Sequence, residues 1–137
     1  MIVAIEQPDP HFTRAPLFGR PITCAVLHDT ETGVVVPPDR PYSYHYQIGR
    51  DGELIRNVPE ADCAYHVAAT DRWRPPFILA PPPGFNLSAV NWCSVGIALV
   101  SDVTARAAGM PYTFGQYHTL HELIADLNER RGQLPYV

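Results

Sequence analysis

Short apolar runs alternate with proline-rich and glycine-rich segments along most of this chain, and one amphipathic stretch lies near its C-terminus. Residues 22–27 form an apolar run with β-branched members, which predicts a buried strand that ends at His28. Residues 95–100 (VGIALV) form a continuous apolar run, which is typical of a strand covered on both faces. We therefore expect residues 95–100 at the centre of a sheet.

A β-hairpin is predicted where residues 44–48 and 53–57 flank the sequence Gly-Arg-Asp-Gly, because Asp51-Gly52 supplies the positive backbone angles that a tight turn needs. Residues 33–41 contain too many prolines for a helix and predict a loop. Residues 68–89 include five prolines among large apolar residues. A loop of that length inside a small domain is usually functional or disordered.

The last predicted element is a helix with a defined start, because Thr113 and Gln116 fit a capping box. The apolar residues that follow recur at helical spacing on one face: Tyr117, Leu120, Leu123, Ile124 and Leu127. Gly132 and Pro135 end the helix. The element order predicts an α/β fold: a single domain with a small mixed central β-sheet flanked by α-helices.

The length of 137 residues indicates one hydrophobic core. Residues 1–21 carry four prolines and predict an extended N-terminal arm that packs on a body made of residues 22–137. The N-terminus has no basic leader, and no run approaches the ~18 apolar residues of a membrane span. We therefore expect no secretory signal and no membrane span, so that the chain is cytoplasmic as synthesised.

Charge and composition exclude several classes of function. A net charge of -4 lacks the positive surface that nucleic acid or an anionic membrane would need. All ten basic residues are arginines, which excludes phosphate-loop and Schiff-base lysines. Three cysteines, at positions 24, 63 and 93, are odd in number and widely spaced, which argues against a disulfide framework.

Six histidines raise the hypothesis of a metal site, although no local spacing is a zinc motif. His118 and His121 lie three apart on the predicted helix, where packing is the simpler interpretation. His11 lies in the arm and is expected to have no role. The other three histidines each neighbour a predicted strand or strand end: His28, His45 and His66.

Four segments in a fixed order carry a family resemblance: residues 22–32 (ITCAVLHDTET), 44–59 (YHYQIGRDGELIRNVP), 64–68 (AYHVA, followed by Trp73) and 91–100 (NWCSVGIALV). Together with the capped helix they resemble the peptidoglycan amidase and peptidoglycan-recognition-protein family. This family includes the bacteriophage lysozyme-type N-acetylmuramoyl-L-alanine amidases.

The resemblance implies a zinc hydrolase that cleaves the amide between N-acetylmuramic acid and L-alanine in peptidoglycan or muropeptides. It implies that His28 is a zinc ligand and that the hydroxyl of Tyr44 orients the metal-bound water or the scissile carbonyl. The residues expected to contact substrate are His66, Trp73, Asn91 and Thr30. An enzyme of this kind would act at the cell wall after release by lysis or another route. Physically, a zinc-bound water is nucleophile enough that no serine, cysteine or lysine is required.

Two departures from the family pattern keep alternatives open. Of the expected zinc triad only His28 is visible, so the chain lacks the metal, recruits other ligands or is part of a longer polypeptide. Ala98 stands where many bacterial members carry a catalytic glutamate. The alternative function is a peptidoglycan-binding module that does not cleave its ligand. A third possibility is a structural domain whose histidines serve packing.

Overall fold

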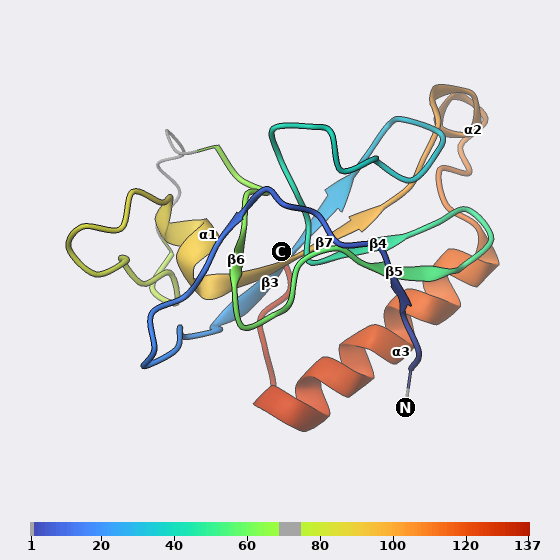
Figure 1. Ribbon diagram of the computed structural model, residues 1–137. Helices are drawn as coiled ribbons and strands as arrows, with labels where there is room; N and C mark the ends of the chain where they lie inside the picture. The colour runs from blue at the N-terminus through green and yellow to red at the C-terminus, as the bar shows by residue number, and fades with distance from the viewer. Residues whose placement is uncertain (1, 69–74) are drawn as a thin grey trace.

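The computed structural model describes residues 2–68 and 75–137. A five-stranded mixed sheet has the order β1-β5-β4-β7-β3, with a long helix along one face (Figure 1). Its strands are β1 (Ile5–Glu6), β5 (Leu54–Arg56), β4 (Tyr46–Ile48), β7 (Ser94–Leu99) and β3 (Cys24–Asp29). A second sheet pairs β2 (Phe12–Thr13) with β6 (Cys63–Ala64). The helices are α1 (Ala89–Cys93), α2 (Val103–Ala107) and α3 (Phe114–Arg131). The predicted α/β class with flanking helices is confirmed.

Strand β7 lies between β4 and β3, parallel to both, and every one of its residues is buried. The prediction of a central strand is therefore confirmed. Strand β3 begins two residues later than the apolar run and extends to Asp29. Its side chains alternate: Ala25 and Leu27 pack with α3, whereas Cys24 and Val26 pack with the cluster around α1. The same alternation turns His28 away from α3.

The hairpin is confirmed as β4 and β5, which pair antiparallel with Ile48 opposite Leu54. Within its turn the positive backbone angle belongs to Gly52 alone (φ 85°), where we had expected Asp51 to share it. The amide of Gly52 donates to the carbonyl of Gly49 at 2.9 Å. A side chain at position 52 would also collide with the backbone of Gly115 at the start of α3. The turn therefore needs glycine both for its angle and for close packing.

Helix α3 begins with the predicted capping box between Thr113 and Gln116 and ends at Gly132 (φ 80°). Gln116 is fully buried, and its amide also donates to the carbonyls of Ile48 and Val100 at 3.1 and 2.6 Å. The helix cap therefore also joins α3 to the ends of β4 and β7. The buried face holds Leu123 and Leu127, while Tyr117 of the predicted apolar stripe is 52% exposed.

The first 21 residues, expected to be an extended arm, contain two short paired strands. Strand β1 pairs in parallel with β5, and β2 pairs antiparallel with β6. His11 contacts the carboxylate of Asp9 at 2.9 Å. The division of the chain at residue 21 stays a prediction. In the part of the chain that the structure describes, no helix combines the length and apolarity needed to cross a bilayer.

Arg20 joins three segments of the backbone at the end of this arm. Its guanidinium donates to the carbonyl of Glu60 at 2.8 and 3.0 Å. It also donates to the carbonyls of Trp92 and Ser94, both at 3.0 Å, and of Asn91 at 3.3 Å. These last carbonyls lie at the C-terminal end of α1, where helix carbonyls lack partners and a positive charge is favourable. Arg20 thus caps α1 from a distant part of the chain.

We predict that Arg20→Met lowers the free energy of unfolding by at least about 2 kcal/mol, because several buried carbonyls lose their donor. Urea denaturation followed by circular dichroism measures the change. Arg14→Met is the matched control, since Arg14 lies exposed in the same arm and its replacement should cost less than about 0.5 kcal/mol. Equal losses from both variants would contradict the role assigned to Arg20.

Candidate active site

His28, Tyr44 and His66 come together at the end of β3. Nε2 of His28 lies 2.9 Å from Nδ1 of His66, and the two rings meet edge to face. The rings of His28 and Tyr44 are 5.3 Å apart between centroids, with a tilt of 49°. These residues belong to three segments that are 16 or more positions apart in the sequence. The fold therefore assembles a cluster that is not local.

Ser94 determines which nitrogen of His66 carries the proton. The Ser94 hydroxyl donates its only hydrogen to the carbonyl of Val90 at 2.5 Å, so its oxygen accepts from Nε2–H of His66 at 3.0 Å. Nδ1 of His66 is then unprotonated and accepts from Nε2–H of His28. The chain of donors runs from His28 through His66 and Ser94 to a backbone carbonyl, and it leaves Nδ1 of His28 with its lone pair.

Gly96 makes room for the His66 ring on the adjacent strand β7. A Cβ at position 96 would lie 2.5 Å from Cγ and 2.9 Å from Nδ1 of that ring. No side chain can be tolerated there without moving the imidazole. The requirement for small residues at 94 and 96, alternate positions on one face of β7, is a signal that sequence reasoning could have used.

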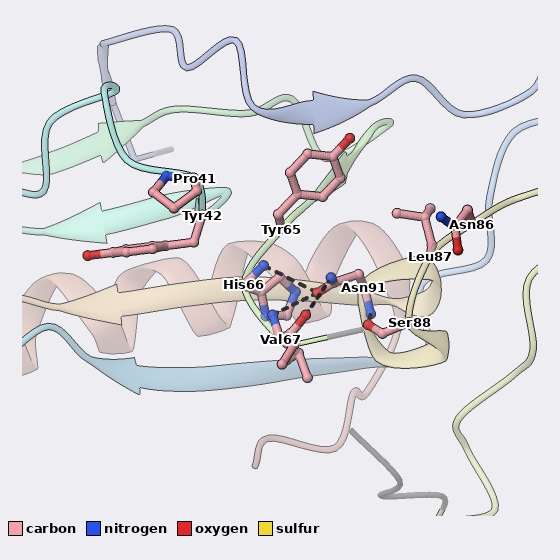
Figure 2. A pocket seen from close by; sticks show the side chains of 10 residues that line it. Pro41, Tyr42, Tyr65, His66, Val67, Asn86, Leu87, Ser88 and Asn91 are labelled. Atoms are coloured by element: carbon pink, nitrogen blue, oxygen red, sulfur yellow. Dashed lines mark hydrogen bonds between the residues drawn. The ribbon is translucent and has the colours of Figure 1, made fainter. Parts of the chain in front are cut away.

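Asn91 holds the backbone that carries His66. Its Oδ1 accepts from the amides of His66 and Val67 at 3.2 and 2.9 Å, and its Nδ2 donates to the carbonyl of Val67 at 2.8 Å. Figure 2 shows the Asn91 and His66 side chains next to one another, with these hydrogen bonds dashed. Asn91 lies in α1, the short helix that directly precedes the central strand β7. Its helix was not predicted.

Two cavities meet at His66. The first, of about 440 Å³, is the pocket of Figure 2 and is lined by Tyr42, Tyr65, His66 and Asn91 among others. The second, also about 440 Å³, is lined by His28, His66, Val90 and Val137 among others. Both include the backbone segment 66–68. His66 therefore stands between an aromatic pocket and the pocket that contains His28.

Burial keeps the histidines of this region neutral. It lowers the pKa of His28 to about 4, and it lowers the pKa of His66 well below its ordinary value, helped by His45 and His28. His45 is fully buried, and its pKa is lowered to about 3 by desolvation and by the charge of Arg20. Nδ1 of His45 accepts from the amide of Gly96 at 2.9 Å, so its other nitrogen donates to the carbonyl of Asp62.

Tyr44 is suited to donate a hydrogen bond and not to act as a base. It is 9% exposed, and burial, with smaller contributions from Tyr42 and Asp29, raises the pKa of its hydroxyl to about 12. The phenol consequently keeps its proton near neutral pH. Ala98, in the place expected for a glutamate in many family members, is fully buried against Tyr44 and Val36.

The other predicted site residues lie elsewhere or are engaged with the protein. Thr30 follows β3, and its hydroxyl oxygen accepts from Thr32 and from the amide of Ser101 at 3.3 Å. Trp73 lies outside the described residues. His118 and His121 are exposed on α3, and His118 lies 3.4 Å from Glu122. The structure thus groups His28, Tyr44, His66 and Asn91, and it places Thr30 in a separate network.

A zinc ion would find one suitable ligand here. His28 is neutral and has a free lone pair at Nδ1, as an imidazole ligand requires. Within residues 2–68 and 75–137 there is no group of three histidine, cysteine or carboxylate side chains that could hold a metal. Sequence reasoning had reached the same single ligand. His28 therefore fits the chemistry of zinc, and a full ligand set needs groups beyond those described.

Solved structures share this fold. N-acetylmuramoyl-L-alanine amidase LysC from Clostridium intestinale matches with a TM-score of 0.63 and 19% identity, over 99% of this chain and 83% of that one. AmpD from Citrobacter freundii matches with a TM-score of 0.58 and 22% identity, over 98% and 76%. The Drosophila peptidoglycan recognition protein PGRP-SA gives 0.58 and 16%, over 95% and 73%. The chain thus has the amidase and recognition-protein fold.

The family follows from the sequence itself. Residues 18–136 match the family model described as N-acetylmuramoyl-L-alanine amidase. The chain belongs to this family, whose members are hydrolases of an amide bond in peptidoglycan, and the predicted resemblance is confirmed. No curated protein matches the chain in sequence.

We predict that Gly96→Ala costs about 1–3 kcal/mol of unfolding free energy, because the added methyl group collides with the His66 ring. In a His66→Ala background the same change should cost much less, since the collision is gone. A double-mutant cycle measured by urea denaturation tests this coupling. The same cost in both backgrounds would show that Gly96 does not serve to admit His66.

We predict that stability falls as the pH is lowered from 6.5 to 5.5. The pKa values of His28, His45 and His66 are lowered in the folded protein, so the unfolded chain binds more protons in this window. Each histidine should contribute about 1 kcal/mol of loss. Urea midpoints at the two pH values measure it, and His45→Gln should reduce the loss by about one third. Stability that is unchanged over this window would contradict neutral burial.

Proposed function

We propose that this chain hydrolyses the amide between N-acetylmuramic acid and L-alanine in peptidoglycan and muropeptides, with zinc as cofactor and His28 as one zinc ligand. The contact between His28, Tyr44 and His66 carries the proposal, together with the two cavities: His66 lines both, and His28 lines one of them. Membership of the amidase family supports the reaction. Because residues 2–68 and 75–137 contain no group of three possible ligands, at least one further zinc ligand would come from outside them.

Each residue of the cluster then has a distinct role. When bound, zinc would supply an activated water and polarise the scissile carbonyl. Tyr44, which keeps its proton, would donate to the carbonyl oxygen as negative charge develops there. His66 would hold the His28 ring in its orientation through the hydrogen bond between the two rings.

The aromatic pocket would hold the glycopeptide beside the scissile bond. Tyr42 and Tyr65 present aromatic surface there, and Asn91 fixes the backbone on which His66 stands. We propose substrate contacts for His66, Asn91, Thr30 and Trp73, as the family resemblance implies. Asn91 would act mainly through the backbone of His66 and Val67, since both lone pairs of its side-chain oxygen are engaged.

We predict that His28→Ala lowers the release of stem peptide from purified sacculi at least ~100-fold and lowers the zinc content of the protein. His121→Ala is the matched control: it removes an exposed histidine on α3 and should leave both quantities unchanged. Zinc is measured by mass spectrometry of the purified protein, and release by chromatography with and without a chelator.

Three other results would count against parts of the proposal. Equal losses in the two variants would place the site elsewhere. Release that a chelator does not affect would overturn the zinc requirement. Capture of muropeptides without any release would identify a binding module, the alternative function that the sequence left open.

A further inference from the structure

The three cysteines, far apart in the sequence, are gathered in one buried cluster. Cys24, Cys63 and Cys93 are each fully buried, and all three are free thiols. They contact apolar residues of α1 and of the loop that precedes it, including Ile78 and Trp92. The sequence spacing, which argued against a disulfide framework, does not reveal this proximity.

Cys24 and Cys93 are neighbours across the junction of β3 with β7. Cys24 is in register with Ser94, so Cys93 is its diagonal neighbour, and the amide of Thr23 donates to the carbonyl of Cys93 at 2.8 Å. Paired strands lie about 4.8 Å apart, and Cys93, the last residue of α1, directly precedes the residue that pairs with Cys24. The two cysteines are therefore close enough along the backbone to be candidates for a disulfide bond.

Backbone groups hold the Cys93 sulfur inside the buried cluster that also contains Cys24. The thiol of Cys93 donates to the carbonyl of Ala89 at 3.2 Å, and its sulfur accepts from the amide of Leu79 at 3.4 Å. The interaction between the two thiols is also the largest cause of both pKa shifts: it raises the pKa of Cys24 and lowers the pKa of Cys93.

Cys63 differs from this pair, although it is buried in the same cluster. It lies on β6, in the small second sheet, and pairs in register with Thr13. Neither of the other two thiols contributes to the pKa shift of Cys63, in contrast to the mutual effect within the pair. Burial raises the pKa of its thiol. Cys63 is therefore a matched internal control for the pair.

We propose that Cys24 and Cys93 form a disulfide-bonding site that closes by exchange with a small aliphatic disulfide. The Cys93 thiolate attacks one sulfur of the reagent, forms a mixed disulfide and releases one thiol. The Cys24 thiolate then attacks the Cys93 sulfur and releases the second thiol. The protein loses two hydrogen atoms, and the reagent disulfide is reduced to two thiols, so that atoms and electrons balance.

The segment before α1 controls access to this site. Residues 77–79 cover the pair: the hydroxyl of Thr23 donates to the carbonyl of Phe77 at 2.5 Å, and Leu79 contacts the Cys93 sulfur. Exchange therefore requires this segment to open. Once formed, the bond joins β3 to the end of α1 and closes a loop of about 70 residues, which restricts the unfolded chain.

The test treats the folded protein with 2-hydroxyethyl disulfide and follows its mass and thermal unfolding. We expect a mass loss of about 2 Da, a Cys24–Cys93 peptide in the unreduced digest and a midpoint of unfolding raised by more than about 5 °C. Cys63→Ser should give the same mass loss and cross-link. Cys24→Ser and Cys93→Ser should give neither and retain a mixed disulfide at most. Addition of dithiothreitol should reverse all changes.

Other outcomes overturn the proposal. A cross-link that includes Cys63, or a mass loss that Cys63→Ser abolishes, would assign the reactive pair differently. No internal cross-link after prolonged exposure, in a sample that forms one in 2 M urea, would show that the folded protein excludes the reaction. None of these readouts depends on amidase activity, so the result stands apart from the proposed function.

Discussion

The guanidinium of Arg20 is the interaction on which the candidate site depends most. This one cation, from the segment between β2 and β3, donates to carbonyls at the end of α1, at the start of β7 and in the turn before β6. Such carbonyls would otherwise be costly to bury. The hydroxyl of Ser94 fixes the orientation of His66, and the backbone carbonyl of the same serine accepts a hydrogen bond from Arg20. The side chain of Arg20 thus links the N-terminal segment to the residues that position His66.

The buried histidines of the site are neutral, and each is held in one orientation by its hydrogen bonds. Ser94 and Gly96 determine how His66 sits, and His66 in turn orients His28. Each of these contacts restricts the rotation of an imidazole ring before a substrate or metal binds. A site that is ordered in advance does not have to reorganise its side chains during the reaction. Ala98 packs against Tyr44 without adding a charge, and burial is the main cause that keeps the proton on the Tyr44 hydroxyl.

Local patterns predicted much of the fold from the sequence. The hairpin around Gly52, the central strand β7 and the capping box at Thr113 each rest on contiguous residues, and the structure confirms all three. The helices α1 and α2 have five residues each and no periodicity to reveal them. Contacts between distant segments leave no local pattern in the sequence. The hydrogen bonds of Arg20, and those of Asn91 to the backbone of His66 and Val67, could therefore not be predicted from it. Only the family resemblance linked His28 with Tyr44 and His66.

Strand β3, which carries His28, is the outermost strand of the five-stranded sheet, yet its free side is occupied. The amides of Ala25 and Leu27 donate to the carbonyls of Pro135 and Val137, and the amide of Val137 donates back to Ala25. An uncovered strand of this kind invites pairing with a second molecule. Here the residues that follow α3 cover this strand edge with three backbone hydrogen bonds. The same three bonds protect the edge against aggregation and hold rigid the strand that carries His28.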